Sequence, residues 1–350
     1  MKISKHACAV GLGFAVLTVL LPLGPGRAQE LRYEVTRKID HMDDYHGTKV
    51  PDPYRWLEDE TSPETAAWVE AQNAITFPYL ERIPFRKALL ERVTELNDYE
   101  RFSAPAQKGR YFFFSKNEGL QNQSVLYIQD GANGAPEVLL DPNAWSSDGT
   151  VQLSAFAPSH DAKYAVYGMS QSGSDWQQYK VLELATKRTL SDTVDWVKVS
   201  SVAWHGDGFY YSRYPEPPEG HEKASINENH LVYFHRLGTP QSADTLVYED
   251  AANAQRFHVV YTTEDERFAI LEISERGKGK DGNALFVRDM TQTDSTFRPL
   301  VPEITNDTFS VVDNVGAEIL VATNHGAPNW RVVAIDPANP AEAYWRTVLA

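Results

Sequence analysis

The sequence predicts a mainly β protein, an incomplete β-propeller preceded by a short helical segment. Three observations support this fold class. From about residue 105 onward, aromatic and β-branched runs alternate with turns rich in Asp, Gly, Asn and Pro, which is the pattern of strands and hairpins. A weak repeat runs through the same region. Before residue 105, apolar residues recur instead with the spacing of amphipathic helices.

Each copy of the repeat has a polar turn leading into an aromatic strand, followed by a second apolar strand. Its period of roughly 45 to 60 residues suits a four-stranded propeller blade. A β-sandwich of ordinary hairpins is the alternative, but regular recurrence favours radial repetition. Five copies, the last one faint, predict about five blades. The copies begin at Lys108–Phe112, His160–Tyr164, Gly206–Tyr210, Glu264–Phe268 and Gly316–Leu320, and their second strands are Val125–Ile128, Tyr179–Leu182, Leu231–Phe234, Ala284–Val287 and Arg331–Ile335.

Two helices are expected before the propeller. Thr61 and Glu64 have the spacing of a capping box with Pro63 in the first turn, and Pro78 is expected to end this helix. The second helix begins at Pro84. Its apolar stripe consists of Phe85, Leu89, Val93 and Leu96. Both helices therefore carry an apolar face that another part of a protein must cover.

The first 28 residues have the pattern of a secretory signal peptide. Basic residues at Lys2 and Lys5 precede an apolar run from Ala7 to Leu23, and small residues lead to a cleavage point after Ala28. A membrane anchor is the alternative, but a run of about 17 residues is at the short limit for a span. We therefore predict a periplasmic or secreted protein with a helical segment over 29–104 and the propeller over 105–350.

Composition narrows the classes of partner. Removal of Lys2, Lys5 and Arg27 leaves 30 basic residues against 48 acidic ones, a net charge of −18. Such a surface repels nucleic acid and anionic membranes, so neither is an expected partner. The only cysteine, Cys8, lies in the predicted signal peptide. The exported protein would then contain no disulfide and would depend on its apolar core.

The motifs of common catalytic sites are missing from the sequence. A nucleophile elbow needs Gly-x-Ser-x-Gly, and the nearest string, Gly168–Ser172, lacks the second glycine and lies in a predicted hairpin. Gly277, Gly279 and Gly282 do not have phosphate-loop spacing. We therefore predict no catalytic residue, no metal and no cofactor in this chain.

Several short motifs resemble one family, the prolyl oligopeptidases, which are serine peptidases that cut short peptides after proline. The strongest is Asp44–Gly47 followed by Asp52–Glu58 and a capped helix. Further stretches, in the same order as in that family, are Gly119–Gln123, Leu140–Asn143, Ser147–Thr150, Ser172–Trp176, Leu237–Thr239, Thr323–Asn324 and Pro328–Asn329. The resemblance extends over essentially the whole chain after the predicted signal peptide.

The resemblance implies more than the residues themselves show. In that family a seven-bladed propeller caps an α/β-hydrolase domain built from both ends of the chain, and the N-terminal helical segment belongs to that domain. The catalytic serine, acid and histidine follow the propeller. The resemblance thus implies missing blades, a catalytic domain that is absent in cis, and no activity of this chain alone. Val199 and Phe257 match stretches that help to line the substrate cleft, with blade packing as the alternative role.

Two functions from different classes follow. The first is the N-terminal portion of an exported prolyl oligopeptidase-like endopeptidase, in which the propeller restricts entry to short proline-containing peptides. The second is a non-catalytic exported propeller that binds a partner, or an inactive remnant. A third possibility is the neighbouring oligopeptidase branch that cuts after Lys or Arg. With its end blades and helices uncovered, the isolated chain is also expected to be poorly stable and prone to associate.

Overall fold

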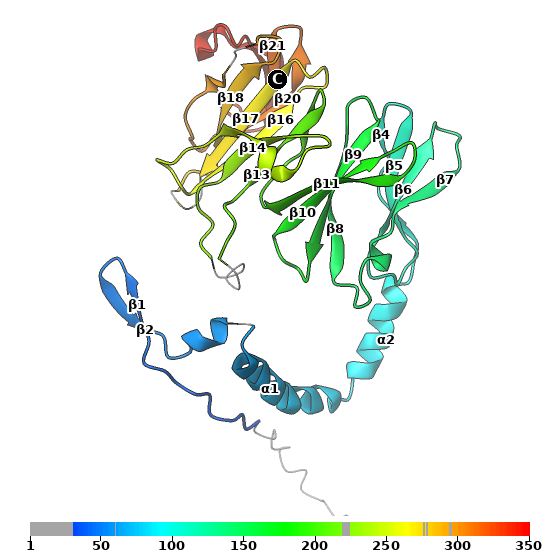
Figure 1. Cartoon of the computed structure of the whole chain (residues 1–350), viewed down its shortest axis with the longest axis vertical. Coiled ribbons are helices and arrows are strands. Elements are labelled where there is room, and N and C mark those ends of the chain that lie inside the picture. Colours follow the sequence, from blue (N-terminus) through cyan, green and yellow to red (C-terminus); the bar gives the residue numbers. More distant parts are fainter. Residues whose placement is uncertain (1–30, 60, 219–224, 276, 278, 294–295) are drawn as a thin grey trace, which may run out of the picture. The chain divides into compact units, whose positions relative to one another are not determined.

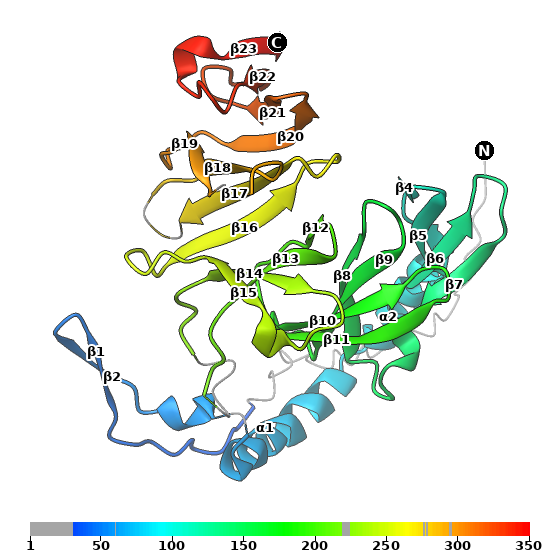
Figure 2. The same ribbon diagram turned by 45° about the horizontal axis from the view of Figure 1, so that its top comes forward.

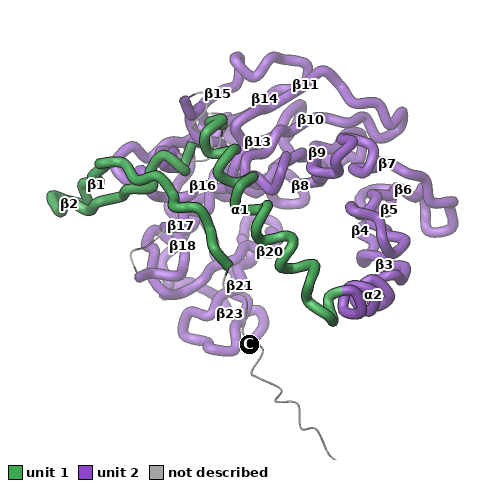
Figure 3. Tube along the Cα trace, turned by 90° about the horizontal axis from the view of Figure 1, so that it is seen from below, with its two compact units in different colours: residues 1–86 green, residues 87–350 purple. Residues whose placement is uncertain are grey.

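The computed structural model describes residues 31–59, 61–218, 225–275, 277, 279–293 and 296–350 (Figure 1). The predicted signal peptide, residues 1–28, lies outside the described residues. The chain divides into two compact units, residues 1–86 and residues 87–350 (Figure 3). Among the described residues, no helix combines the length and apolarity needed to span a membrane.

The first unit contains the hairpin of the Asp44–Gly47 motif. Strands β1 (Met42–Tyr45) and β2 (Thr48–Pro51) pair antiparallel, and His46 and Gly47 both have positive φ angles, 55° and 90°. Two successive residues with positive φ form the tight turn that suits the twist of a hairpin. Asp44 accepts a hydrogen bond from the Gly47 N–H over 2.6 Å, which fixes this turn.

Arg55 explains why the motif continues to Glu58. It lies in a short 3₁₀ helix, Arg55–Glu58, and its guanidinium pairs with Asp43, with Asp52 and with Glu58. The guanidinium thereby ties the β1–β2 hairpin to the segment that leads into the first helix. The apolar residues of the motif are only partly buried.

Helix α1 (Pro63–Glu81) differs at both ends from the sequence-based expectation. Its N-cap is Ser62, whose side chain accepts from the Glu64 N–H, while the Thr61 hydroxyl bonds Asp59 instead. Because Pro63 occupies the first helical position, the residue directly before it takes the capping role. Pro78 lies inside the helix and does not end it. It removes one hydrogen bond near the last turn, which a helix end tolerates better than its middle.

Helix α2 (Arg86–Asn97) follows Pro84 as predicted. Its apolar stripe is uncovered in this chain: Leu89, Val93 and Leu96 are 57%, 47% and 54% exposed. No residue of this helix is buried.

The remaining chain forms five successive antiparallel blades (Figures 1 and 2). The pairing of Val197 with Arg213 joins blades 2 and 3 into one eight-stranded sheet. Blade 1 contains β3 (Arg101–Phe102), β4 (Ala106–Lys108), β5 (Tyr111–Asn117), β6 (Val125–Asp130) and β7 (Pro136–Leu140). Blade 2 contains β8 (Val151–Pro158), β9 (Tyr164–Gln171), β10 (Gln177–Glu183) and β11 (Arg188–Val197). Blade 3 contains β12 (Ala203–His205), β13 (Gly208–Arg213), β14 (Leu231–Arg236) and β15 (Thr245–Tyr248). Blade 4 contains β16 (Arg256–Thr262), β17 (Phe268–Glu275), β18 (Asn283–Asp289) and β19 (Arg298–Val301). Blade 5 contains β20 (Phe309–Val315), β21 (Glu318–Thr323), β22 (Arg331–Ile335) and β23 (Arg346–Leu349).

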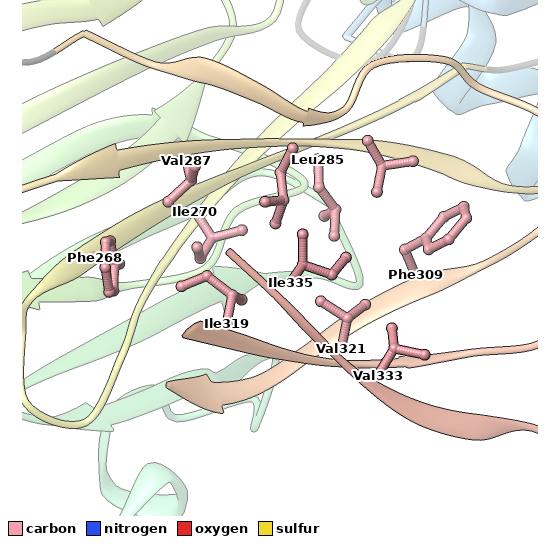
Figure 4. Packing of buried hydrophobic residues seen from close by; sticks show 11 residues of the cluster. Phe268, Ile270, Leu285, Val287, Phe309, Ile319, Val321, Val333 and Ile335 are labelled. Carbon is pink, nitrogen blue, oxygen red and sulfur yellow. The ribbon is translucent and has the colours of Figure 1, made fainter. Parts of the chain in front are cut away.

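Each pair of successive blades shares one hydrophobic cluster. Blades 4 and 5, for example, enclose Phe268, Ile270 and Leu285 from one side and Phe309, Ile319 and Val333 from the other (Figure 4). Similar clusters join blades 1 and 2, blades 2 and 3, and blades 3 and 4. The propeller core is therefore divided into layers between the sheets.

This layering explains the sequence pattern of the strands. In β9, β13 and β17 four or five successive residues are buried, because both faces of a middle blade are covered and alternation disappears there. In β21 of the last blade, burial alternates from residue to residue, as expected for a strand covered on one face. The five predicted repeat units and the mainly β fold class are confirmed.

Candidate functional site

The two residues predicted to line a substrate cleft lie at the same end of the blades. Val199 is in the connection between β11 and β12, and Phe257 is the second residue of β16. Because neighbouring strands in a blade are antiparallel, the beginnings of its first and third strands and the ends of its second and fourth strands share one end. We call this end the start face, and we call the opposite end, where the first strand turns into the second, the turn face.

His230 connects the surroundings of these two residues. Its Nε2 lies 3.0 Å from the carbonyl oxygen of Lys198, the residue before Val199, and its ring makes an edge contact with Phe257 at 6.0 Å between centroids. The backbone N–H of His258 donates to His230 Nδ1 over 2.9 Å. His230 thus joins the β11–β12 connection to β16. Whether Val199 and Phe257 contact substrate stays a prediction.

These contacts fix the protonation state of His230. A backbone N–H can only donate, so Nδ1 carries a lone pair and the single proton is on Nε2, where it donates to Lys198. Burial, opposed by the hydrogen bond to Lys198, lowers the pKa of His230 to about 4. Burial likewise lowers the pKa of His258, whose Nδ1 lies 2.6 Å from the His230 carbonyl oxygen. Both rings are neutral at neutral pH.

The start face also contains an aromatic corner, which we define as Trp176 and Trp196. Their rings meet edge to face, 5.6 Å apart with an interplanar angle of 87°. Lys198 lies over the Trp176 ring at 4.8 Å and pairs with Asp175 over 3.6 Å. Beside the corner is a cavity of about 280 Å³ that is also lined by Met169, Gln177 and Gln178. Sequence reasoning used Trp176 only as part of a family motif and missed Trp196.

Two bulky residues near the corner have a strained backbone. The φ angles of Trp196 and Val199 are 60° and 52°, in the left-handed region that glycine and asparagine favour. For a β-branched residue such as Val199 this conformation is a clear outlier. Strain of this kind persists only where the surroundings enforce it, and it concentrates at ligand-binding sites. This observation supports the end of β11 and the β11–β12 connection as part of a site.

The Gly168–Ser172 string has a structural role. It lies at the end of β9, and Ser170 is buried and accepts from the Gln152 amide over 2.9 Å. Gly168 is required by packing, because a Cβ there would come within 2.7 Å of Ser154 Oγ and 3.0 Å of Gln177 Oε1. The prediction that this string lies in a hairpin is confirmed, because β9 pairs antiparallel with β10.

A separate polar cluster, the turn-face cluster, consists of Lys108, His160, Thr262 and Glu264. Lys108 Nζ lies 2.6 Å from Glu264 Oε1 and 3.1 Å from His160 Nδ1, and His160 Nε2 lies 3.2 Å from Thr262 Oγ1. Partial burial opposes ionisation of Glu264, but Lys108 and His160 together lower the pKa of this carboxyl. The cluster connects blades 1, 2 and 4, which are not all consecutive.

The described residues do not offer an activated nucleophile at either face. The one hydroxyl that contacts a histidine ring within the described ranges is that of Thr262, and it donates to the Trp204 carbonyl.

A propeller with this repeat and these motifs defines the class of the protein. The chain belongs to the prolyl oligopeptidase family: residues 33–350 match the family model described as prolyl oligopeptidase, N-terminal beta-propeller domain. It is 38% identical over 351 aligned positions to the prolyl endopeptidase of Elizabethkingia meningoseptica, covering 100% of this chain and 48% of the relative. It is 33% identical over 345 positions to prolyl oligopeptidase A of Amanita bisporigera, covering 88% of this chain and 45% of the relative.

Solved structures agree with this assignment. A prolyl endopeptidase structure superposes with a TM-score of 0.78 at 31% identity, covering 91% of this chain and 46% of that chain. Prolyl oligopeptidase B from Galerina marginata, bound to a 35mer hydrolysis and macrocyclization substrate, superposes with a TM-score of 0.75 at 28% identity, covering 91% of this chain and 47% of that chain. The chain spans about half the length of the relatives that it matches.

Proposed function

We propose that this chain is the propeller-bearing, N-terminal portion of an exported prolyl oligopeptidase-like serine endopeptidase. In the complete enzyme, the propeller would admit short proline-containing peptides to a catalytic domain. The family membership and the peptide-bound relative support the substrate class. The predicted signal peptide supports export.

The observation that carries the restricting role is the turn-face cluster. Lys108 and Glu264 form their ion pair between blades 1 and 4, and His160 of blade 2 is hydrogen-bonded to both Lys108 and Thr262. An ion pair between sheets that are distant in sequence holds the turns of these blades together at one end of the propeller. A folded protein would be excluded there, whereas the start face keeps the aromatic side chains of Trp176 and Trp196 for peptide contact.

A chimera tests the enzyme assignment. This chain would be followed by the part of the Elizabethkingia meningoseptica relative that it does not match, and a proline-linked chromogenic peptide would be the substrate. We expect turnover that a serine-directed phosphonate abolishes, and none from residues 29–350 alone. A well-folded chimera without proline-specific turnover, or phosphonate-sensitive turnover by the chain alone, would contradict the proposal.

The restricting role has its own test in the same chimera. Glu264→Gln removes the charge that holds Lys108 and should raise cleavage of long peptides relative to short ones. Lys163→Met is the matched control, because Lys163 lies in the same turn as His160 but, among the described residues, forms an ion pair with the exposed Asp161 alone. An unchanged ratio of long to short substrates in Glu264→Gln would show that the cluster is purely structural. N-terminal sequencing of the secreted chain, with Gln29 expected first, tests export.

A further inference from the structure

The start face has a cavity beside Trp176 and Trp196. We propose that the aromatic corner docks a proline-rich segment of a peptide in polyproline II conformation, with Trp196 as the main contact. This inference rests on the proposed function for the class of ligand only. The observations that carry it are the aromatic geometry, the hydrogen-bond donors around the cavity and the way in which the backbone of Trp196 is held.

The geometry of the two rings suits proline. Trp176 is held in place because Lys198 lies over its ring at 4.8 Å and Tyr214 makes an edge contact at 6.2 Å. Trp196 meets it at an angle of 87°, so the two rings form a corner and not a flat stack. Grooves lined by aromatic rings bind polyproline II segments, whose shape is formed before binding and costs little entropy. A cavity of about 280 Å³ accommodates small rings, not a folded domain.

The hydrogen-bonding groups favour proline over other residues. Within the described residues, neither the Trp196 indole N–H nor the amide nitrogen of Gln177 has a hydrogen-bond partner, while Gln177 Oε1 accepts from Ser154 over 2.8 Å. Both residues line the cavity, which therefore offers donors. A proline-rich peptide has backbone carbonyls to accept but lacks backbone N–H groups that would need acceptors. The cavity, whose aromatic walls carry hydrogen-bond donors, is therefore complementary to a proline-rich peptide, whose backbone has only acceptors.

The chain also fixes Trp196 in position. The backbone of the preceding residue, Asp195, is clamped from both sides by Gln241, whose Oε1 accepts from Asp195 N–H and whose Nε2 donates to Asp195 O, each over 3.0 Å. The Asp195 side chain accepts from Gln178 over 2.7 Å. These three bonds hold the end of β11, where Trp196 takes its left-handed conformation. A strained residue beside three such bonds points to a positioned contact residue.

Calorimetric titration of the full chain with an acetylated peptide of six prolines tests the inference, with the same peptide made of alanines for comparison. We expect saturable binding of the proline peptide and at least about tenfold weaker binding of the alanine peptide. Trp196→Asn should weaken proline-peptide binding by at least about tenfold, as loss of an aromatic anchor does. Asparagine tolerates the left-handed conformation, so this variant keeps the backbone.

Two further variants distinguish the contribution of the Trp196 ring to binding from an effect of substitution on the fold. Trp196→Phe keeps an aromatic face but removes the donor and should give an intermediate affinity. Trp330→Ala is the matched control, because Trp330 also has a positive φ, 67°, and is 45% exposed, but lies in blade 5. The Trp330→Ala variant should bind the proline peptide as tightly as the unaltered chain does. Equal binding of proline and alanine peptides, no binding by the unaltered chain, or undiminished binding by Trp196→Asn would each overturn the inference.

The result also remains distinct from the test of the enzyme assignment. Proline-peptide binding that depends on Trp196, together with an inactive chimera, would support the docking site and contradict the enzyme assignment. An active chimera together with peptide binding that does not depend on Trp196 would support the enzyme assignment and contradict the docking site.

Discussion

The backbone N–H of His258 donates to Nδ1 of His230 over 2.9 Å, and this bond is compatible only with a neutral His230 ring. A protonated imidazole has no acceptor nitrogen. The contact therefore couples the β11–β12 connection and the first strand of blade 4 to the protonation state of one buried side chain. Tyr214 and Phe257 enclose the His230 ring, while Tyr248, Asp250 and Arg256 are the groups nearest His258 that can carry charge.

Acidification should destabilise the propeller through His230. Its pKa is about 4 when folded and 6.5 in the reference state, so between these values the unfolded chain binds the proton and the native chain does not. Stability then falls as pH falls, by up to about 1.4 kcal/mol per pH unit. Urea unfolding from pH 7 to pH 4 measures this slope. His230→Gln, which keeps a donor and an acceptor but does not titrate, should flatten it, and an unaltered slope would contradict the assignment.

His235 should have the opposite pH dependence. It is buried between Asp244, at 2.7 Å from Nδ1, and Asp192, at 3.2 Å from Nε2. Burial opposes the charged ring, but the two carboxylates together raise the pKa of His235. A raised pKa stabilises the fold fully below the unfolded value, and that contribution is lost as pH rises through the folded value. Asp192→Asn should lower the pKa of His235, which an NMR titration of its ring can detect; no change would exclude a direct charge effect.

Gly168→Ala should destabilise blade 2, and it would also crowd Gln177, which lines the cavity beside Trp176. The new Cβ would lie 2.7 Å from Ser154 Oγ and 3.0 Å from Gln177 Oε1, and overpacking of this kind costs about 1 to 3 kcal/mol. The free energy of unfolding in urea is the measurement. Ser154→Ala in the same chain removes the closest atom and should restore part of the loss. If Gly168→Ala alone and Gly168→Ala combined with Ser154→Ala have the same free energy of unfolding, a contact other than that with Ser154 causes the loss.

The apolar stripe of α2 should make the chain associate. Leu89, Val93 and Leu96 are each about half exposed or more, and exposed contiguous apolar surfaces of this kind mark contact sites or aggregation hazards. Leu89→Glu should reduce hydrophobic-dye binding and the apparent mass in light scattering without lowering the melting temperature. Lys87→Glu on the same helix is the control. A monodisperse monomer without dye binding before any substitution would contradict this expectation and favour a self-contained propeller.

The strands could be predicted from the sequence, whereas the geometry of the site could not. Runs such as Phe268–Leu271 are continuous and apolar because both faces of a middle blade are buried, and this is a local property of composition. The left-handed conformations of Trp196 and Val199 have no such signal, because they depend on contacts from Gln241 and His230 that are distant in sequence. The start of α1 was misplaced by one residue because Thr61 and Ser62 both have capping side chains.

The layers between the blades also determine how the molecule can come apart. In β17, Phe268 and Ile270 belong to the cluster shared with blade 5, while the intervening Ala269 and Leu271 belong to the cluster shared with blade 3. Alternate side chains of the same strands thus pack a middle blade against both of its neighbours. A blade at either end of the row packs against one neighbour only. If the chain were stretched from its termini, the blades would unfold one at a time, beginning with the outer ones. They would not unfold in a single cooperative transition. The same arrangement lets a row of sheets gain or lose an outer member by gene duplication or deletion while the inner joints remain intact.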